Sequence, residues 1–285
     1  MAHDIMDTMT SKYNSLTKSG KKVADYIFAN RLEVQFMSIT ALADECNVAE
    51  ATVFRLCRAL GFAGYNDLKL ELAKASGASM PNDDYSLYGK ITDEDDISDM
   101  CRKLYATNVS ALTQTLELVD ENAINKAVDY LEAANHVYCF GQGGSLILAM
   151  EAWARFLTTS SKFYCIEDSH LQAVSASLAQ PGDVIMFFTY TGATRDMLDV
   201  LVPARARGAK TIIFTHFKRS PVTAHADVML LCGSKEGPLQ SGSVAAKMGN
   251  LFLIDVLFNE FCRRRKDEYI VNKELTTKSI ADKLL

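Results

Sequence analysis

Five short apolar runs alternate with helical patterns in the second half of the sequence, and this alternation constrains the fold more than any other feature. The runs span residues 136–140, 162–166, 184–190, 210–215 and 228–232. Strands joined by helices run parallel, because each helix returns the chain to the same edge of the sheet. We therefore expect an α/β three-layer domain with a doubly wound, five-stranded parallel sheet. Its expected order is 2-1-3-4-5, which is common for five-stranded sheets of this type.

The third run ends in a polar stretch that contains a glycine. Thr189, Tyr190, Thr191, Gly192 and Thr194 follow the apolar residues and precede a helical pattern. A helix start has unpaired N–H groups and a partial positive charge, short hydroxyls add donors, and glycine lets the backbone come close to a ligand. A single threonine here would indicate an ordinary helix cap. Three hydroxyls around a glycine favour a phosphate site.

The first run ends in a similar cluster, which also opens a helical pattern. In the order 2-1-3-4-5 the sheet reverses direction between its first and third strands, and ligands bind in that crevice beyond the carboxyl ends of the strands. The two clusters are therefore expected to meet. We assign to this ligand site Gly141, Gln142, Gly143, Ser145, Thr189, Tyr190, Thr191, Gly192 and Thr194, together with Glu236 from the loop after the fifth run.

A dinucleotide site is the competing interpretation of the first cluster. Gly141 and Gly143 begin the glycine fingerprint, and Glu167 or Asp168 follows the second run as a ribose-binding acid would. Leu146 occupies the third glycine position, however, and the threonine cluster would have no role. The seven cysteines are scattered without a Cys-x-x-Cys pair, so we expect reduced structural thiols, no metal and no cofactor.

Residues 12–75 show short helical patterns and no strand pattern. In the third of these helices, residues 50–60, the apolar side chains form one stripe, while Arg55 and Arg58 lie on the opposite face with Thr52 at its edge. Two short helices, a tight turn at Asn47 and an exposed pair of arginines are typical of a helix-turn-helix. From geometry alone, a solvated basic face on a small helical bundle is an equally good interpretation.

Charge and composition divide the chain. The net charge is −5, and the acidic excess lies after residue 76, so a nucleic-acid contact is expected to be local and N-terminal. Residues 77–90 have the composition of a linker. We predict a DNA-binding domain at residues 1–76, a linker at 77–94, and a ligand-binding domain with flanking helices at 95–285.

The helix-turn-helix part contains the motifs Met37-Ser-Ile-x-x-Leu-Ala43, Ala51-Thr-Val-x-Arg55 and Leu60-Gly-Phe-x-Gly-Tyr65. In these motifs the chain resembles RpiR-type regulators, bacterial proteins that control sugar metabolism. Residues from about 120 to 262 are similar to the sugar-isomerase (SIS) domain, with Gly-x-Gly-x-Ser at 141–145 and Thr-Tyr-Thr-Gly-Ala-Thr at 189–194. The expected DNA-binding residues are Ala49, Glu50, Thr52, Arg55, Arg58 and Tyr65.

Two departures from the family pattern bear on function. Ala49 replaces the usual serine before the recognition helix, and the loss of that cap costs about 1 kcal/mol and one hydroxyl that could reach a phosphate. Threonine replaces serine at 189 and 191, which keeps the hydroxyls but adds methyl groups that narrow the pocket.

The resemblance implies a cytoplasmic DNA-binding regulator of a sugar or amino-sugar operon, expected to be a repressor, a homodimer or tetramer, and controlled by a phosphosugar. The alternative is an aldose–ketose sugar-phosphate isomerase, for which Glu236 and His225 could supply acid–base groups. Both residues are read more simply as solvated surface groups, and an isomerase has no use for a helix-turn-helix. We expect no enzyme and no membrane segment.

Overall fold

The computed structural model describes residues 5–77, 91–234 and 244–281, and all structural statements below concern these residues. They cluster into two compact units, one formed by the described residues up to Thr107 and the other by Asn108–Ser234 together with the residues from Val244 onward. Each unit is described by itself. The division falls within one continuous helix, α7 (Ile97–Leu118). The domain boundaries expected from sequence remain a prediction.

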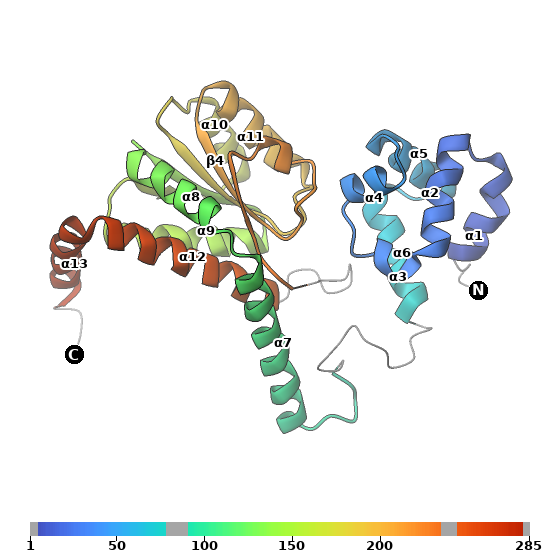
Figure 1. Cartoon of the computed structure of the whole chain (residues 1–285), viewed down its shortest axis with the longest axis horizontal. Coiled ribbons are helices and arrows are strands. Elements are labelled where there is room, and N and C mark those ends of the chain that lie inside the picture. Colours follow the sequence, from blue (N-terminus) through green and yellow to red (C-terminus); the bar gives the residue numbers. More distant parts are fainter. Residues whose placement is uncertain (1–4, 78–90, 235–243, 282–285) are drawn as a thin grey trace. The chain divides into compact units, whose positions relative to one another are not determined.

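The first unit is helical (Figure 1). Its elements are α1 (Ile5–Lys12), the 3-10 turn η1 (Tyr13–Ser15), α2 (Lys18–Ala29), α3 (Arg31–Val34), α4 (Ile39–Glu45), α5 (Glu50–Leu60) and α6 (Tyr65–Gly77). The Thr17 hydroxyl accepts the Gly20 N–H at the start of α2, and Ser38 accepts the Ala41 N–H at the start of α4. A shared apolar core holds these helices together.

The pair α4 and α5 forms the expected helix-turn-helix arrangement. Asn47 takes a left-handed conformation (φ +49°) in the turn, as a side chain that tolerates this region can. The apolar stripe Val53, Leu56, Cys57 and Leu60 is buried, as predicted. Gly61 ends α5 with φ +103°, and the Phe62 N–H bonds back to Cys57 O at 2.9 Å.

The second unit contains a five-stranded sheet. Its strands are β1 (Val137–Gly141), β2 (Phe163–Cys165), β3 (Val184–Phe188), β4 (Lys210–Thr215) and β5 (Val228–Leu231). All neighbouring pairs are parallel and the order is β2-β1-β3-β4-β5, so the predicted topology is confirmed. Each predicted run coincides with a strand to within a few residues at its ends.

Helices cover both faces of the sheet (Figure 1). α8 (Glu121–Ala133), α9 (Gly144–Leu157) and α12 (Val244–Arg264) share one apolar core with the sheet, whereas α10 (Ser169–Ser177) and α11 (Arg195–Ala206) share the core of the other face. Along β3, Val184, Met186 and Phe188 belong to the first core, and Ile185 and Phe187 belong to the second. Burial on both faces explains why this run is apolar throughout.

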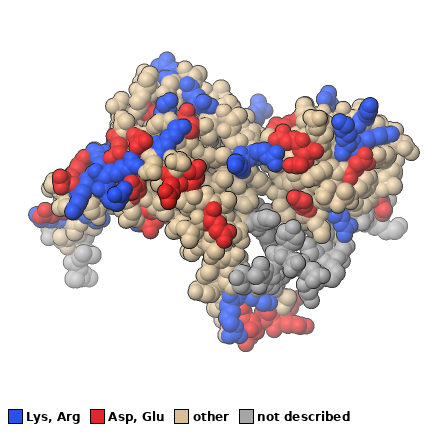
Figure 2. Space-filling model, viewed as in Figure 1, with Lys and Arg blue, Asp and Glu red and all other residues tan. Residues whose placement is uncertain are grey.

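The chain continues through a short 3-10 turn, η2 (Thr223–His225), before β5 and ends in α13 (Lys266–Ala281). Basic side chains gather over α12 and α13 beside acidic ones (Figure 2). Arg263 and Arg264 pair with Glu260, and Arg264 also pairs with Asp129. These pairs account for the basic run at 263–266 as a charged helix end. Among the described residues, no helix combines the length and apolarity required to span a membrane.

Candidate functional site

The loops after β1 and β3 leave the sheet side by side. Gly141, the last residue of β1, is in register with Phe188, the last residue of β3, on directly paired strands. Thr189 follows Phe188, so the two polar clusters begin at the same edge of the sheet. They start where the strand order reverses, as the predicted topology requires, and their assignment to one ligand site stays a prediction.

The hydroxyls of the β3 loop have different surroundings. Thr189 is only 6% exposed, and its Oγ1 accepts the Gly192 N–H at 3.0 Å, so this hydroxyl shapes the loop. Thr191 is half-buried, and its Oγ1 accepts the Ala193 N–H at 3.3 Å. Thr194 is exposed at the start of α11 and, within the described part of the chain, gives that helix no side-chain cap. The first N–H groups of α11 therefore lack a side-chain acceptor.

Gly192 is required by the shape of this loop. Its φ is +61°, and a Cβ at this position would lie 2.1 Å from Ser220 Oγ. Its carbonyl accepts the Val222 N–H at 3.1 Å, which ties the loop to the turn after β4. Ser220 is buried, and its Oγ has no hydrogen-bond partner among the residues that the structure describes.

The β1 loop is held by its backbone and by one buried amide. A Cβ on Gly141 would lie 2.6 Å from Ser145 O, and Gly143 precedes α9 with φ +53°, so both glycines are needed for this tight turn. Gln142 donates to Gln172 Oε1 at 3.0 Å, and Gln172 donates to Gly141 O at 3.2 Å. The Gln142 side chain is thus tied to α10, while Ser145 lies half-buried in the first turn of α9.

Two residues that hold or charge this site were missed by the sequence analysis. Gln172 is fully buried on α10, where its amide also donates to Ile166 O at 2.6 Å. Lys247 on α12 places its Nζ 3.8 Å from where a Cβ on Gly144 would stand. The sequence signal that could have identified Lys247 is a lysine within an otherwise apolar stretch of a helix. Lysines are rarely buried without a partner, so a lysine in such a stretch indicates a structural or functional role.

Tyr190 points from the β3 loop toward the end of β5. Its hydroxyl donates to Ser234 O at 2.9 Å, and its ring stacks on His216 with a centroid separation of 5.0 Å. Because the hydroxyl is used within the fold, its expected contact with a ligand has less support than those of the threonines. Glu236, also expected at the site, lies outside the described residues.

The exposed face of α5 carries the expected arginines. Arg55 and Arg58 are exposed, and Arg55 Nε donates to Ala51 O at 3.1 Å. Ala49 has the extended conformation of an N-cap but supplies no side-chain acceptor, and in its place the Thr52 N–H bonds to Ala49 O at 2.8 Å. Thr52 is half-buried, and Glu50 accepts a hydrogen bond from Thr40, which links the start of α5 to α4.

The Tyr65 side chain is buried, so its expected contact with DNA has less support than those of the exposed arginines. It is 7% exposed, and its hydroxyl donates to Val34 O at 3.2 Å. Burial raises the pKa of its phenol above the usual value. The ring fills the core next to α3, so the residue supports the fold and its side chain is not free to reach a phosphate.

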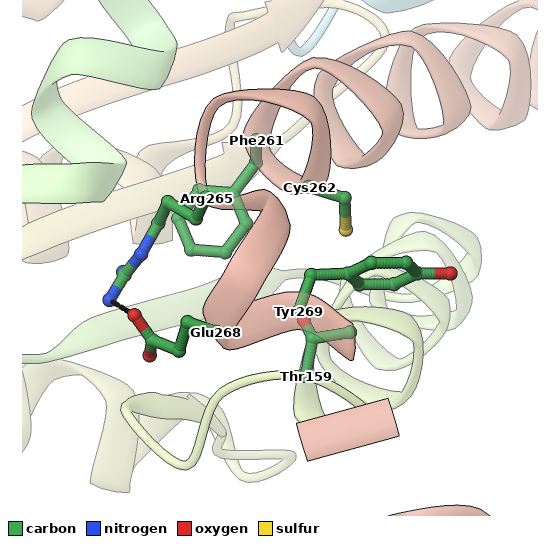
Figure 3. A pocket seen from close by; sticks show the side chains of 6 residues that line it. All are labelled: Thr159, Phe261, Cys262, Arg265, Glu268 and Tyr269. Carbon is green, nitrogen blue, oxygen red and sulfur yellow. Dashed lines mark hydrogen bonds and ion pairs between the residues drawn. The ribbon is translucent and has the colours of Figure 1, made fainter. Parts of the chain in front are cut away.

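A small pocket lies at the junction of α12 and α13, next to Thr159 (Figure 3). Its lining residues are Thr159, Phe261, Cys262, Arg265, Glu268 and Tyr269. Arg265 extends to Glu268, with which it is paired, and its guanidinium lies 5.2 Å from the Phe261 ring centroid. Burial raises the pKa of the Cys262 thiol, which lowers the fraction present as thiolate. Arg265 is paired with Glu268 through Nη2, while its buried Nη1 has no hydrogen-bond partner among the residues that the structure describes. None of the residues expected at the ligand site lines this pocket.

Comparison with known proteins matches both halves of this chain. The model of the helix-turn-helix domain of the rpiR family matches residues 3–79, and the SIS domain model matches residues 130–260. The HTH-type transcriptional regulator HexR of Pseudomonas aeruginosa is 32% identical over 214 residues, which cover 74% of this chain and 73% of HexR. HexR of Escherichia coli is 29% identical over 286 residues, covering 99% of this chain and 97% of that protein.

A solved structure extends the similarity to the fold of the whole chain. The Vibrio vulnificus NanR protein complexed with ManNAc-6P has a TM-score of 0.87 and 29% identity, and covers 99% of this chain and 100% of NanR. The helix-turn-helix on α4 and α5, the sheet order and the two polar loops agree with these matches. The chain therefore belongs to the RpiR family of HTH-type transcriptional regulators, with a helix-turn-helix domain followed by a SIS domain.

Proposed function

We propose that this regulator responds to a sugar phosphate bound where the loops after β1 and β3 meet. The observation that carries the proposal is the register pairing of Gly141 with Phe188, which starts both loops from neighbouring strands at one edge. The uncapped start of α11 and the ammonium of Lys247 near Gly144 add positive potential at that edge.

The individual residues have distinct proposed roles. Ser145, Thr191 and Thr194 offer hydroxyls to the phosphate, and the first-turn N–H groups of α11 offer backbone donors. Thr189 keeps the loop in shape through its bond with Gly192 N–H. Lys247 contributes charge from α12. A phosphate held in this way would leave the sugar hydroxyls to be recognised by the rest of the crevice.

The class of ligand follows from the relatives. NanR is described in complex with ManNAc-6P, an amino-sugar phosphate. We propose that this chain represses an operon of sugar or amino-sugar metabolism in the cytoplasm and that the phosphosugar weakens operator binding. A ligand shifts DNA affinity only by as much as it prefers one arrangement of the protein over another, typically about 1–3 kcal/mol.

The proposal is tested by measuring operator affinity with and without a panel of hexose, pentose and N-acetylamino-sugar 6-phosphates. The operator is first selected from random DNA with the purified protein. Inorganic phosphate and the matching unphosphorylated sugars serve as controls. A phosphosugar that binds at micromolar concentration yet leaves operator affinity unchanged would sink the sensor role. Conversion of an aldose phosphate into a ketose phosphate in the same samples would instead support the isomerase.

We further propose that the regulator is a dimer that pairs through α7. Ile97, Leu104, Tyr105, Val109 and Leu116 are exposed on this helix, with Ile97 at 76% and Tyr105 at 72%. A row of large apolar side chains in water favours a partner surface, and two helix-turn-helix domains can read half-sites about one helical turn apart. Sedimentation equilibrium at micromolar concentration tests this, with Tyr105→Glu expected to shift the protein toward monomer. A monomeric parent protein, both with and without operator DNA, would rule out the dimer.

A further inference from the structure

The segment directly after β5, Gly233 and Ser234, is hydrogen-bonded to side chains of α7. The Gly233 N–H donates to Thr115 Oγ1 at 2.9 Å, and the Ser234 N–H donates to Gln114 Oε1 at 3.2 Å. Both acceptors lie in the part of α7 that belongs to the same compact unit as the sheet. Two successive backbone amides are therefore fixed by two successive side chains of one helix.

The segment after β5 is also closely packed against α7. Thr115 is fully buried, and its hydroxyl donates to Ala111 O at 2.6 Å while it accepts the Gly233 N–H, so its one donor is used. A Cβ on Gly233 would lie 2.5 Å from Gln114 Cβ, and a Cβ on Gly249 of α12 would lie 2.5 Å from Thr115 Oγ1. Because close-packed interiors transmit strain and two hydrogen bonds join these segments, we expect a displacement of the β5 end to move this part of α7 with it.

The same segment is held from the other side by the β3 loop. Tyr190, located between Thr189 and Thr191, donates from its hydroxyl to Ser234 O at 2.9 Å. Its ring stacks on His216, which bonds through Nδ1 to Cys232 O at 3.0 Å. Ser234 has φ +91°, a conformation that a residue with a side chain rarely adopts and that is kept only where surrounding contacts determine it.

We propose that Tyr190, Ser234, Gln114 and Thr115 form a mechanical relay that transmits occupancy of the phosphate loop to α7. The proposal rests on the proposed sensor function. In this relay, closure of the β3 loop around a phosphate displaces Tyr190. The hydrogen bond from Tyr190 to Ser234 O then displaces the end of β5. The bonds from Gly233 and Ser234 to Thr115 and Gln114 pass this displacement to α7. The chain runs from α7 back to the DNA-binding helices, so α7 is the covalent route by which the ligand can bias them. These four residues are positioning residues, because their bonds lie within the fold.

The first experiment needs no ligand. Backbone amide hydrogen exchange is measured in full-length parent protein and in Tyr190→Phe, which keeps the ring on His216 and removes only the hydroxyl. Loss of one hydrogen bond corresponds to about a fivefold change in local opening, so exchange at Gly233, Ser234 and residues 108–118 is expected to rise about fivefold. Exchange in this region that stays within twofold of the parent would overturn the relay.

The second experiment uses Thr115→Val with Thr113→Val as its matched control. The Thr113 hydroxyl is exposed and bonds only to Val109 O within α7, so its loss removes no contact to β5. The probe is whichever compound of the 6-phosphate panel changes parent operator affinity most, a change expected to be about 5–150-fold. We expect Thr115→Val to bind this probe like the parent, while the ligand effect on operator affinity falls to less than a third.

The outcomes separate the two proposals. If the parent protein responds to no phosphosugar, the sensor function fails, and the exchange measurement still decides whether Tyr190 and α7 are mechanically linked. If the parent responds and Thr115→Val responds as strongly as Thr113→Val, the sensor function stands and the relay is wrong.

Discussion

The helices of this protein begin in two different ways. Five of them start beneath a side-chain oxygen that accepts a first-turn N–H, namely α2 with Thr17, α4 with Ser38, α7 with Asp96, α8 with Asp120 and α10 with Asp168. In contrast, α3, α5, α9 and α11 have N-cap residues whose side chains accept no such bond within the described part of the chain. α3 has only four residues, and the other three are the second helix of the helix-turn-helix and the two helices that follow the polar loops. Some of their first-turn N–H groups bond to nearby backbone carbonyls, as the Thr52 N–H does to Ala49 O. The other first-turn N–H groups are the donors that we propose for phosphate oxygens.

The helix starts of α11 and α5 nevertheless differ in the groups that they offer to a phosphate. Around α11 the donors are backbone N–H groups and short hydroxyls, and the loop shape is fixed by Thr189 and Gly192. On α5 the groups that could contact DNA are the long side chains of Arg55 and Arg58, which are exposed on a helix whose opposite face is buried. The proposed anion site should therefore respond to the change of one hydroxyl or one methyl group. The proposed DNA-binding face should respond to removal of the charge of Arg55 and Arg58.

The largest expected effect is on the DNA face. Arg55→Ala combined with Arg58→Ala should lower operator affinity by about 30-fold or more, because a base-reading arginine is worth about 1–3 kcal/mol. Fluorescence anisotropy at several salt concentrations measures this and separates base contacts from phosphate contacts by the salt slope. The charge-matched control is Lys18→Ala with Lys22→Ala on α2, both exposed. Equal losses in the two double variants would reduce the role of α5 to a general charge effect.

Next in size is the hydroxyl of the β3 loop. Thr191→Ala should weaken the phosphosugar by about 10- to 150-fold, since a hydrogen bond to a charged group contributes about 1.5–3 kcal/mol. Thr191→Ser keeps the hydroxyl and is expected to bind within a fewfold of the parent. Isothermal titration calorimetry on both variants provides the comparison. Similar affinity in Thr191→Ala and Thr191→Ser would show that the backbone donors carry the phosphate alone.

A smaller effect is expected at the start of α5. Ala49 already has the extended N-cap conformation (φ −76°, ψ 149°), so Ala49→Ser can add a cap without moving the chain. The helical unit should gain about 1 kcal/mol of unfolding free energy, measured by urea denaturation followed by circular dichroism. Operator affinity should rise or stay equal if the serine hydroxyl turns to a DNA phosphate. A weaker operator complex would mean that the uncapped N–H groups themselves bind the DNA.

The smallest effect is expected at Tyr65, where one substitution distinguishes a role in fold stability from a role in DNA binding. Tyr65→Phe removes the hydroxyl that bonds to Val34 O but keeps the buried ring, so the unfolding free energy should fall by about 0.5–1.5 kcal/mol. Operator affinity of the folded protein should remain unchanged, because the side chain is buried. A clear loss of affinity without a loss of stability would return Tyr65 to the DNA-contacting residues.

Much of the fold could be predicted because hydrophobic periodicity records burial directly. The five strands, the sheet order and the buried stripe of α5 were all predicted, and their physical basis is the alternation of apolar runs with helical patterns. The convergence of the two polar loops followed from the order of the strands alone.

Hydrophobic periodicity could not predict which polar side chains would be buried in the folded protein. Gln172 was passed over because a glutamine in a helical pattern is usually solvated, although here it is fully buried beneath the β1 loop. Tyr65 was placed near DNA because the motif ends there, whereas long-range packing against α3 buries it. Lys247 is separated from Gly144 by more than a hundred residues, and only the folded chain brings them together.

The close packing of α7 against the end of β5 has a consequence for anyone who recombines regulators of this kind. Gly233 and Gly249 fit around Thr115 with no space for a methyl group, so these positions can be exchanged only as a set. A chimera that joins a foreign ligand-binding domain after α7 would combine mismatched surfaces. A biosensor built from this protein should instead be spliced ahead of Ile97, so that α7 travels with the sheet that it grips.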